Sequence, residues 1–235
     1  MYIVALIPAR KGSKRIPNKN MKLYAGHPLI YWSIKVAKAS KYINEVIITT
    51  DCSDIAVYCV KQGASVPFVR PSIISQDLST DHEFIEHYIN WAYDNNKMPD
   101  LIVQLRPTYP NRKVNIVDDC IQQFINNSHY HSLRTVCLND KPAYKMYNIY
   151  GDVLVPLFNK VSNITEPYNQ PAQLLPKTYW HNGYVDIIKP SVVITKGSIT
   201  GSLIYPYVMD SKEINDIDTE EDWLLSESKF LNLIN

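Results

Sequence analysis

Residues 2–8 read YIVALIP and residues 9–22 read ARKGSKRIPNKNMK. The apolar run ends at a proline and predicts a buried β-strand, and the loop after such a strand is where open α/β sheets bind ligands. The loop carries six cations, and no acidic residue occurs before Glu45 to neutralise them. Gly12 and Ser13 leave room for backbone N–H groups to approach phosphate oxygens. The position of this loop therefore favours an anion-binding site over a solvated basic turn.

Strand and helix patterns alternate along the rest of the chain. Apolar or β-branched runs predict strands at residues 45–50, 63–69, 101–105 and 133–138. Helical spacing predicts helices at residues 28–39, 55–60, 80–95 and 115–126, the third of them opening on a capping box at Thr80. Sheet signals return at residues 183–188 and 202–206, and an acidic turn at residues 218–222 opens a C-terminal helix. We therefore expect one α/β domain over residues 1–235, with a mainly parallel sheet covered by helices on both faces.

Residues 139–180 break this alternation. Five prolines interrupt a stretch rich in tyrosine and asparagine that shows no sustained periodicity. About forty residues without regular elements are uncommon inside a compact domain. We therefore predict an inserted lobe that serves as a lid, a substrate wall or a subunit contact, and its tyrosines and apolar residues are typical of an interface.

The composition narrows the classes of partner and location. The 24 basic and 23 acidic residues give a net charge of +1, so no global field favours nucleic acid or a membrane surface. The four cysteines form no CxxC pair and favour a reduced, cytoplasmic protein without disulfides. The N-terminal apolar run is too short for a signal peptide or a membrane span. His129 and His131 have no nearby acidic or thiol partners, and we expect no metal there.

Four stretches at predicted strand ends or turns carry a family resemblance, namely residues 10–20, 106–112, 181–183 and 216–222. In this order, and over almost the whole chain, they resemble the cytidylyltransferases that make CMP-activated acidic sugars, the CMP-sialic acid synthetase family. That family has a loop Ala-Arg-x-x-Ser-Lys-x-x-Pro-x-Lys-Asn, which this chain matches at Ala9, Arg10, Ser13, Lys14, Pro17, Lys19 and Asn20. The resemblance implies a Rossmann-like α/β fold with a small inserted lobe for substrate and dimer contacts.

The resemblance also implies a chemistry. The chain would bind CTP and Mg²⁺, transfer CMP to the anomeric hydroxyl of a sugar and release pyrophosphate. Arg10, Lys14 and Lys19 would neutralise the leaving pyrophosphate as fixed donors. The nucleotide-binding residues that the resemblance implies are Ala9, Arg10, Ser13, Asn20, Arg70, Asp77 and Thr80.

Asp216 and Asp218 resemble the metal site of the family. Two carboxylates are a typical number for a Mg²⁺ that completes its shell with water and phosphate oxygens. We therefore place Asp218 among the catalytic residues as well. The alternative is that these acids, with Thr219 and residues 220–222, only cap a helix.

The predicted sugar pocket departs from the family. Residues 106–112 read RPTYPNR where sialate enzymes usually have QPTSPLR, and Ala172 stands where the family has an arginine that faces the acidic sugar. We hypothesise that Arg106 takes over the grip on the sugar carboxylate through a bidentate pair. The sugar-binding residues that we predict are Arg106, Thr108, Tyr109, Gln173, Asn182 and Gly183.

The leading interpretation is a Mg²⁺-dependent transferase that joins CMP to a nine-carbon α-keto acid of the sialic, legionaminic or pseudaminic type and acts as a homodimer. The exchange at Arg106 and Ala172 leaves open a shorter sugar acid such as Kdo, or another sugar nucleotide pyrophosphorylase. A non-catalytic nucleotide-binding module is a third interpretation. The pair Asp216 and Asp218 argues against it, because a phosphate binder needs only the basic loop.

Overall fold

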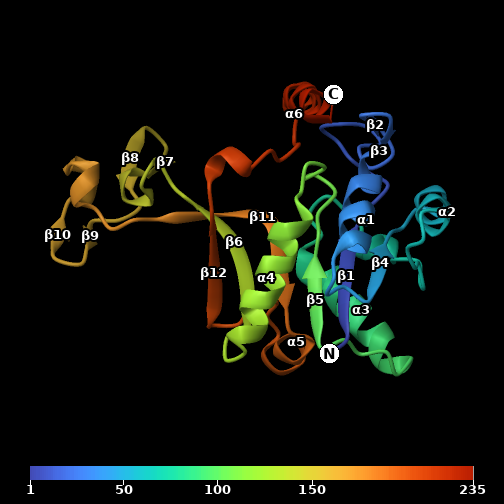
Figure 1. Ribbon diagram of the computed structural model, residues 1–235. Helices are drawn as coiled ribbons and strands as arrows, with labels where there is room; N and C mark the ends of the chain where they lie inside the picture. The colour runs from blue at the N-terminus through green and yellow to red at the C-terminus, as the bar shows by residue number, and fades with distance from the viewer. Residues whose placement is uncertain (235) are drawn as a thin grey trace.

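A computed structural model describes residues 1–234 of the chain. Its centre is a six-stranded sheet with the strand order β12-β6-β11-β5-β1-β4 (Figure 1). These strands are β1 (Ile3–Pro8), β4 (Glu45–Thr49), β5 (Leu101–Gln104), β6 (Ser132–Leu138), β11 (Tyr179–Ile188) and β12 (Ile204–Met209). β1 pairs in parallel with β4 and β5, β12 pairs in parallel with β6, and β11 runs antiparallel to both of its neighbours. The predicted, mainly parallel α/β sheet is confirmed.

Helices cover both faces of this sheet. One face packs against α1 (Leu29–Ala39), α2 (Ser53–Lys61) and α4 (Val114–Asn126), and the other against α3 (Asp81–Asp94) and α5 (Pro190–Lys196). β1 is buried on both sides: Ala5 and Ile7 join the core under α1 and α4, whereas Val4 and Leu6 join the core under α3. A strand buried on both faces needs apolar residues at every position, which explains the unbroken apolar run of the sequence.

A third apolar cluster holds the basic loop, residues 9–22, against the end of the chain. Ile16 of the loop and Tyr24 pack with Ile217 and Trp223. Tyr24 belongs to the short hairpin of β2 (Leu23–Tyr24) and β3 (His27–Pro28), and Trp223 belongs to α6 (Glu220–Ile234), which follows η5 (Ser211–Glu213). The cluster therefore places the acidic turn before α6 beside the basic loop.

Residues 63–69, predicted as a strand, do not form one. They make a single β-bridge, between Ser65 and Ile47 of β4. Pro67 has no N–H to donate, so it cannot extend the pairing. The chain then continues through Arg70 to the short helix η1 (Ser72–Ile74), which borders the site described below.

The inserted lobe projects from the ends of β6 and β11, away from the main sheet (Figure 1). It holds two hairpins and three single-turn helices: β7 (Tyr147–Tyr150), β8 (Val153–Pro156), β9 (Lys160–Val161), β10 (Ile164–Thr165), η2 (Ala143–Lys145), η3 (Pro167–Asn169) and η4 (Ala172–Leu174). The expectation of a stretch without regular elements is wrong. Its strands have two to four residues, which is too short to produce a periodic pattern.

β11 contains a bulge near the middle of its length. His181 pairs with Val136 and Asp186 pairs with Arg134, so the chain takes five steps along β11 for two along β6. Gly183 lies inside the bulge with a φ of +72°, a conformation that favours glycine. Among the described residues, none of the helices combines the length and the apolar character of a membrane span.

Candidate functional site

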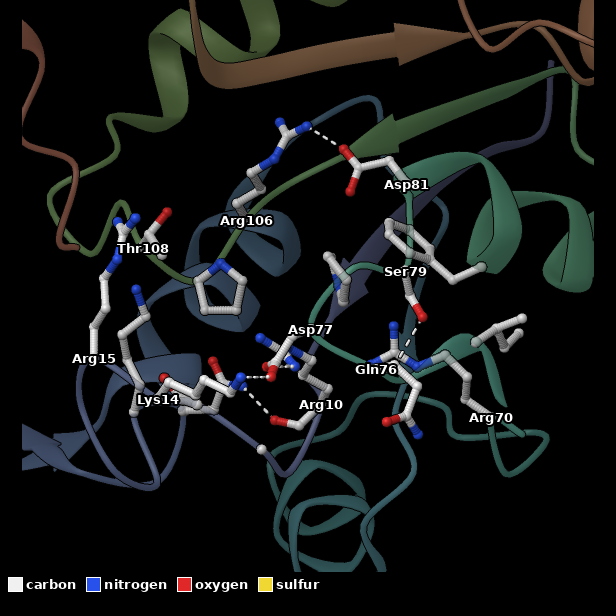
Figure 2. A pocket seen from close by; sticks show the side chains of 18 of the residues that line it. Arg10, Lys14, Arg15, Arg70, Gln76, Asp77, Ser79, Asp81, Arg106 and Thr108 are labelled. Carbon is white, nitrogen blue, oxygen red and sulfur yellow. Dashed lines mark hydrogen bonds and ion pairs between the residues drawn. The ribbon is translucent and has the colours of Figure 1, made fainter. Parts of the chain in front are cut away.

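A pocket of about 610 Å³ opens where β1 and β5 end, between the basic loop and the start of α3 (Figure 2). β1 delivers the basic loop to it, and β5 delivers residues 106–108. Six cationic and three acidic side chains line the pocket: Arg10, Lys14, Arg15, Lys19, Arg70, Arg106, Asp77, Asp81 and Asp218. The surplus of positive charge suits a polyanionic ligand.

The structure brings most of the residues predicted from the sequence to this pocket. Those that line it are Arg10, Ser13, Lys14, Lys19, Asn20, Arg70, Asp77, Arg106, Thr108 and Asp218. Ala9 is buried beneath the loop, where its N–H donates to the carbonyl of Thr49 at 3.0 Å. Thr80 forms the predicted capping box with Glu83 at the start of α3 and lies outside the pocket lining. Gln173 lies exposed in the lobe.

Asp77 holds two cations of the basic loop. Arg10 Nη1 lies 2.7 Å from Asp77 Oδ1, and the ammonium group of Lys14 contacts the other carboxylate oxygen (Figure 2). The hydrogen bonds from Lys14 and Arg10 lower the pKa of the Asp77 carboxyl. Asp77 is thus an internal counterion for the two loop cations that face the cavity.

Asp218 plays the same part for two other cations of the basic loop. Its carboxylate lies 3.2 Å from Arg15 Nη1 and 3.4 Å from Lys19 Nζ. Lys19 Nζ also donates to the carbonyl oxygen of Ile217 at 2.6 Å. The N–H of Ile217 in turn donates to the carbonyl of Thr108 at 3.0 Å, so the acidic turn is tied to both the basic loop and the loop after β5.

The capping of α6 is carried by other residues than Asp216 and Asp218. The hydroxyl of Thr219 donates to Asp222 at 2.7 Å, and the N–H of Asp222 donates back to that hydroxyl at 3.1 Å. The N–H of Asp218 also donates to the Asp222 carboxylate, at 3.1 Å. With the N–H of Thr219 also donating to the Asp222 carboxylate, at 2.8 Å, the arrangement is a capping box, and it does not use the carboxylates of Asp216 and Asp218.

The donor set of Asp216 and Asp218 fits a hard divalent cation. Burial of the Asp216 carboxyl raises its pKa. A hydrogen bond from Thr108 lowers the pKa and the negative charge of Asp218 raises it further, so the net shift is upward. A bound cation would relieve the repulsion between the two carboxylates. The described residues contain no group of three or more histidines, cysteines or acids, so this pair would leave most of a metal shell to water and phosphate oxygens.

Arg70 is a buried guanidinium that lacks partners. Only 4% of its surface is exposed, and neither Nε nor Nη2 has a hydrogen-bond partner among the described residues. It lies over the ring of Phe84 at 5.6 Å and lines the pocket. Burial lowers its pKa. Because a buried donor without a partner costs free energy, a polar ligand in the pocket would stabilise this arrangement.

Arg106 lines the pocket, but two carboxylates of the protein already hold it. Its Nη1 lies 2.7 Å from Asp186 Oδ2 and 3.2 Å from the carbonyl of Gly183, and its Nη2 contacts Asp81 (Figure 2). This differs from the free carboxylate clamp that we expected from the sequence. A sugar carboxylate beside Arg106 would share one cation with two acids, so the geometry opposes that role.

The structure buries three residues that we predicted as sugar contacts, namely Tyr109, Asn182 and Gly183. Tyr109 is buried and its hydroxyl donates to the carbonyl of Asn182. The Asn182 amide is buried and accepts from the hydroxyl of Thr135 at 2.6 Å. A Cβ on Gly183 would lie 3.0 Å from Nη1 of Arg106, so glycine is needed there for close packing. All three residues are buried, and their contact with a sugar stays a prediction.

Sequence reasoning missed the acids that orient Arg106. In the sequence, Asp81 follows the predicted helix cap at Thr80, and Asp186 lies within the sheet signal at residues 183–188. Asp186 Oδ1 also lies 2.7 Å from His181 Nε2, across the bulge of β11. A charged residue inside an otherwise apolar strand signal, as at Asp186, was the sign that could have identified a buried ion pair.

The chain matches known proteins over nearly its full length. The profile of the cytidylyltransferase family matches residues 4–174. CMP-N,N'-diacetyllegionaminic acid synthase of Legionella pneumophila is 33% identical over 97% of this chain and 95% of its own. Pseudaminic acid cytidylyltransferase of Campylobacter jejuni is 28% identical over 100% of this chain and 98% of its own. N-acylneuraminate cytidylyltransferase A of Danio rerio is 30% identical over 98% of this chain but only 51% of its own.

The fold of this chain also matches solved structures over nearly the full length. That of CMP:2-keto-3-deoxy-manno-octonic acid synthetase complexed with CTP superposes with a TM-score of 0.70, covering 99% of both chains at 14% identity. That of 4-diphosphocytidyl-2C-methyl-D-erythritol synthase from Anaerococcus prevotii superposes with a TM-score of 0.63 at 12% identity, covering 98% of both chains. At these identities the likeness concerns the fold alone. Together with the match over residues 4–174 and the full-length relatives, the basic loop and its pocket identify the chain as an enzyme of the cytidylyltransferase family.

Proposed function

We propose that the chain transfers CMP from CTP to the anomeric hydroxyl of a nine-carbon α-keto sugar acid, of the sialic, legionaminic or pseudaminic type, and releases pyrophosphate. The observation that carries this proposal is one pocket lined by six cations of which the basic loop supplies four, with Asp218 on its wall. The full-length relatives named for legionaminic and pseudaminic acids support the sugar class.

Arg10, Lys14 and Lys19 are the residues that we assign to the phosphates of CTP. Attack on the α-phosphate moves negative charge onto the leaving pyrophosphate, and fixed cations stabilise that charge without reorganising. Arg10 and Lys14 would exchange the carboxylate of Asp77 for phosphate oxygens of the nucleotide. The Nε of Arg70, which is buried and has no partner among the described residues, would donate to the cytidine part of the ligand.

Mg²⁺ is the cation that we propose for Asp216 and Asp218. When bound, it would neutralise phosphate charge and orient the nucleotide for an in-line displacement. Asp218 would then give up part of its contact with Arg15 and Lys19, which would leave both cations available to phosphate oxygens. Thr108 would keep Asp216 oriented through its hydrogen bond.

The test is a pyrophosphate-release panel of four nucleoside triphosphates against several keto-sugar acids, with and without Mg²⁺. We expect release only with CTP, a nine-carbon acid and the metal. Preference for an eight-carbon acid such as Kdo would replace the sugar class and keep the chemistry. CTP binding without release on any acid, measured by calorimetry, would leave a non-catalytic nucleotide-binding module and refute the proposal.

We also propose that the enzyme is a homodimer joined through the inserted lobe. The hairpin of β7 and β8 exposes apolar side chains, with Ile149 73% and Leu154 58% exposed in the single chain. Such a patch on a projecting arm is typical of a protein interface. Ile149→Asp should convert a dimer to a monomer in analytical ultracentrifugation, whereas Leu78→Asp, on an exposed loop before α3, should not. Wild-type protein that sediments as a monomer at micromolar concentration would contradict the proposal.

Gln173 lies on the same lobe, so a dimer is the arrangement in which we propose that it approaches a sugar. The compartment that we propose is the cytoplasm, because all four cysteines are buried thiols that a reducing environment would preserve.

A further inference from the structure

Two of the six arginines have a buried N–H without a partner in the part of the chain that the structure describes. They are Arg70 and Arg134. Arg10, Arg15 and Arg106 each contact a carboxylate, and Arg112 donates to two backbone carbonyls and a serine hydroxyl. Arg70 belongs to the nucleotide pocket. Arg134 remains without an assigned role.

Arg134 lies in a row of polar side chains that leads out of the pocket. On three neighbouring strands, Gln104 of β5 pairs with Asp186 of β11, and Asp186 pairs with Arg134 of β6. Residues that pair across a sheet point to the same face, so the three side chains share the face covered by α3. Gln104 donates to Asp81 on the pocket wall at 3.0 Å. Two strand spacings, about 10 Å, separate Arg134 from β5, and an arginine side chain spans much of that distance.

The one acid of this row, Asp186, already has partners for both of its oxygens, whereas Arg134 has no acidic partner among the described residues. Asp186 is 4% exposed, and its two oxygens contact Arg106 and His181, each at 2.7 Å. Within the described part of the chain, the guanidinium of Arg134 has one hydrogen-bond partner, the ring of His181, with Nη1 3.5 Å from Nδ1. Because Nη1 is a donor, Nδ1 accepts in this contact and His181 donates through Nε2 to Asp186. Arg134 therefore has no carboxylate partner among the described residues, and its buried Nε has no hydrogen-bond partner there either.

The surface around Arg134 is open on one side. Pro206 of the edge strand β12 pairs with Arg134, and its neighbours on the same face, Ile204 and Val208, are 40% and 56% exposed. No described helix covers these positions, because α3 and α5 pack under β1, β5 and the end of β11. A ligand that extends from the nucleotide pocket along the row would cross β11 and reach Arg134 on β6, with the exposed apolar residues of β12 on the far side of Arg134.

We propose that Arg134 binds the carboxylate of the acidic sugar substrate, in place of Arg106. The inference rests on the proposed function, in which an acidic sugar lies beside the nucleotide. In an α-keto sugar acid the carboxylate is attached to the anomeric carbon, so its binding site must adjoin the pocket where the hydroxyl reacts. Arg106 is held by Asp81 and Asp186, so we assign it to linking α3 and β11 beside the pocket. Arg134 presents a planar fork that matches a carboxylate.

The experiment compares Arg134→Gln with the wild type on the sugar acid and on its methyl ester. We expect the wild type to prefer the acid, and Arg134→Gln to raise the KM for the acid about 30-fold or more, leave the KM for CTP within twofold and lose the preference over the ester. Arg134→Lys keeps the charge but not the fork, and its KM should lie between the two. Lys61→Gln, which removes an exposed cation at the end of α2, is the matched control.

Each outcome separates this assignment from the proposed function. If the wild type turns over the acid and Arg134→Gln keeps both its KM and its preference for the acid over the ester, the assignment is wrong and the proposed function stands. If the wild type forms no CMP-sugar from any acid, the proposed function fails and the assignment falls with it. If Arg134→Gln does not fold, Arg134→Lys decides, because an unchanged preference and KM in that variant would also refute a bidentate grip.

Discussion

Lys19 Nζ lies 2.6 Å from the carbonyl oxygen of Ile217 and 3.4 Å from the carboxylate of Asp218, although the residues stand 198 and 199 positions apart in the sequence. One ammonium group therefore connects the basic loop to the acidic turn before α6. The contact joins the two halves of the site that we propose for phosphate and metal. It also makes the geometry of each half depend on the other.

Replacing Lys19 by methionine should weaken both catalysis and the fold. The variant loses a charge-assisted hydrogen bond, which contributes about 2 kcal/mol, and the melting temperature should fall by roughly 4–8 °C. Loss of a phosphate-facing cation should lower kcat/KM about 100-fold. Calorimetry and steady-state kinetics measure the two effects. Lys11→Met is the control: the ammonium group of Lys11 makes no ion pair or hydrogen bond among the described residues, and a similar loss there would contradict the distinction between these cations.

Asp218→Asn should abolish metal-activated turnover and leave the fold intact. The substitution removes one of the two carboxylates that we assign to Mg²⁺, so titration with the metal should show little activation over the millimolar range. Asp222→Asn is the matched control, because its carboxylate accepts hydrogen bonds from Asp218 and Thr219 just before α6 and does not belong to the proposed metal pair. It should lower the melting temperature while the metal titration stays normal. Equal metal activation in Asp218→Asn and the wild type would remove the metal assignment.

Asp186→Asn should destabilise the protein at neutral pH by about 3 kcal/mol, because it breaks a buried ion pair with Arg106. Burial raises the pKa of Asp186, but the hydrogen bond from His181 and the charge of Arg106 outweigh it and lower the pKa below its ordinary value. A lowered pKa stabilises the fold above the ordinary carboxyl pKa of about 3.9, and that contribution is lost as the pH falls through the folded value. Urea unfolding at pH 7 and pH 3 should show the gap to the wild type narrowing; a constant gap would contradict the ionised pair.

Asp216→Asn should change the stability of the fold in the opposite direction and stabilise it at neutral pH. The pKa of Asp216 is raised by burial and by Asp218, so ionisation of this carboxyl costs the ligand-free fold free energy at neutral pH. The asparagine variant should therefore unfold at a higher urea concentration than the wild type at pH 7. The advantage should vanish below the ordinary carboxyl pKa of about 3.9, where both states of the wild type are protonated. A variant less stable than the wild type at pH 7 would overturn this sign.

Gly183→Ala should displace Arg106 from Asp186. The new Cβ would lie 3.0 Å from Arg106 Nη1 and would also strain a backbone with a φ of +72°. Gly197→Ala, at a φ of +58° with no atom within 4 Å, isolates the strain alone, which costs about 1–2 kcal/mol. We expect Gly183→Ala to be the less stable variant and to lower turnover, measured by thermal unfolding and pyrophosphate release. Equal stability of the two variants would show that the close contact with Arg106 contributes nothing.

The sequence was informative where a residue acts close to its own strand. Arg10, Ser13, Lys14 and Asn20 follow β1 directly, so a buried strand and a basic loop were enough to place them in the pocket. The strand β1 could be predicted because it is apolar at every position, as burial on both faces requires. The strand predicted at residues 63–69 does not form. Its β-branched residues suggested a strand, but Pro67 ends the pairing after a single bridge at Ser65.

The sequence was less informative where long-range pairing decides the role of a side chain. Arg106 looked like a free cation because Asp81 and Asp186, which hold it, come from a helix start and a strand after a bulge. Tyr109 and Asn182 neighbour the site in the sequence, but their side chains point into the core. The environment of Arg134 cannot be predicted from the sequence, because only the alignment of β6, β11 and β5 shows that its cross-strand neighbour Asp186 contacts Arg106 and His181 instead.

The pairs that Asp77 and Asp218 form with the basic loop have a consequence for how the pocket responds to salt. A row of bare cations would attract dissolved anions, and its affinity for a nucleotide would fall steeply with ionic strength. Here four of the cations already rest on carboxylates that belong to the protein. A phosphate that enters exchanges places with a tethered carboxylate and displaces few ions from solution. The affinity of the pocket for a nucleotide should therefore depend only weakly on the salt concentration. Chloride, with a single charge, competes poorly with a ligand that carries several charges.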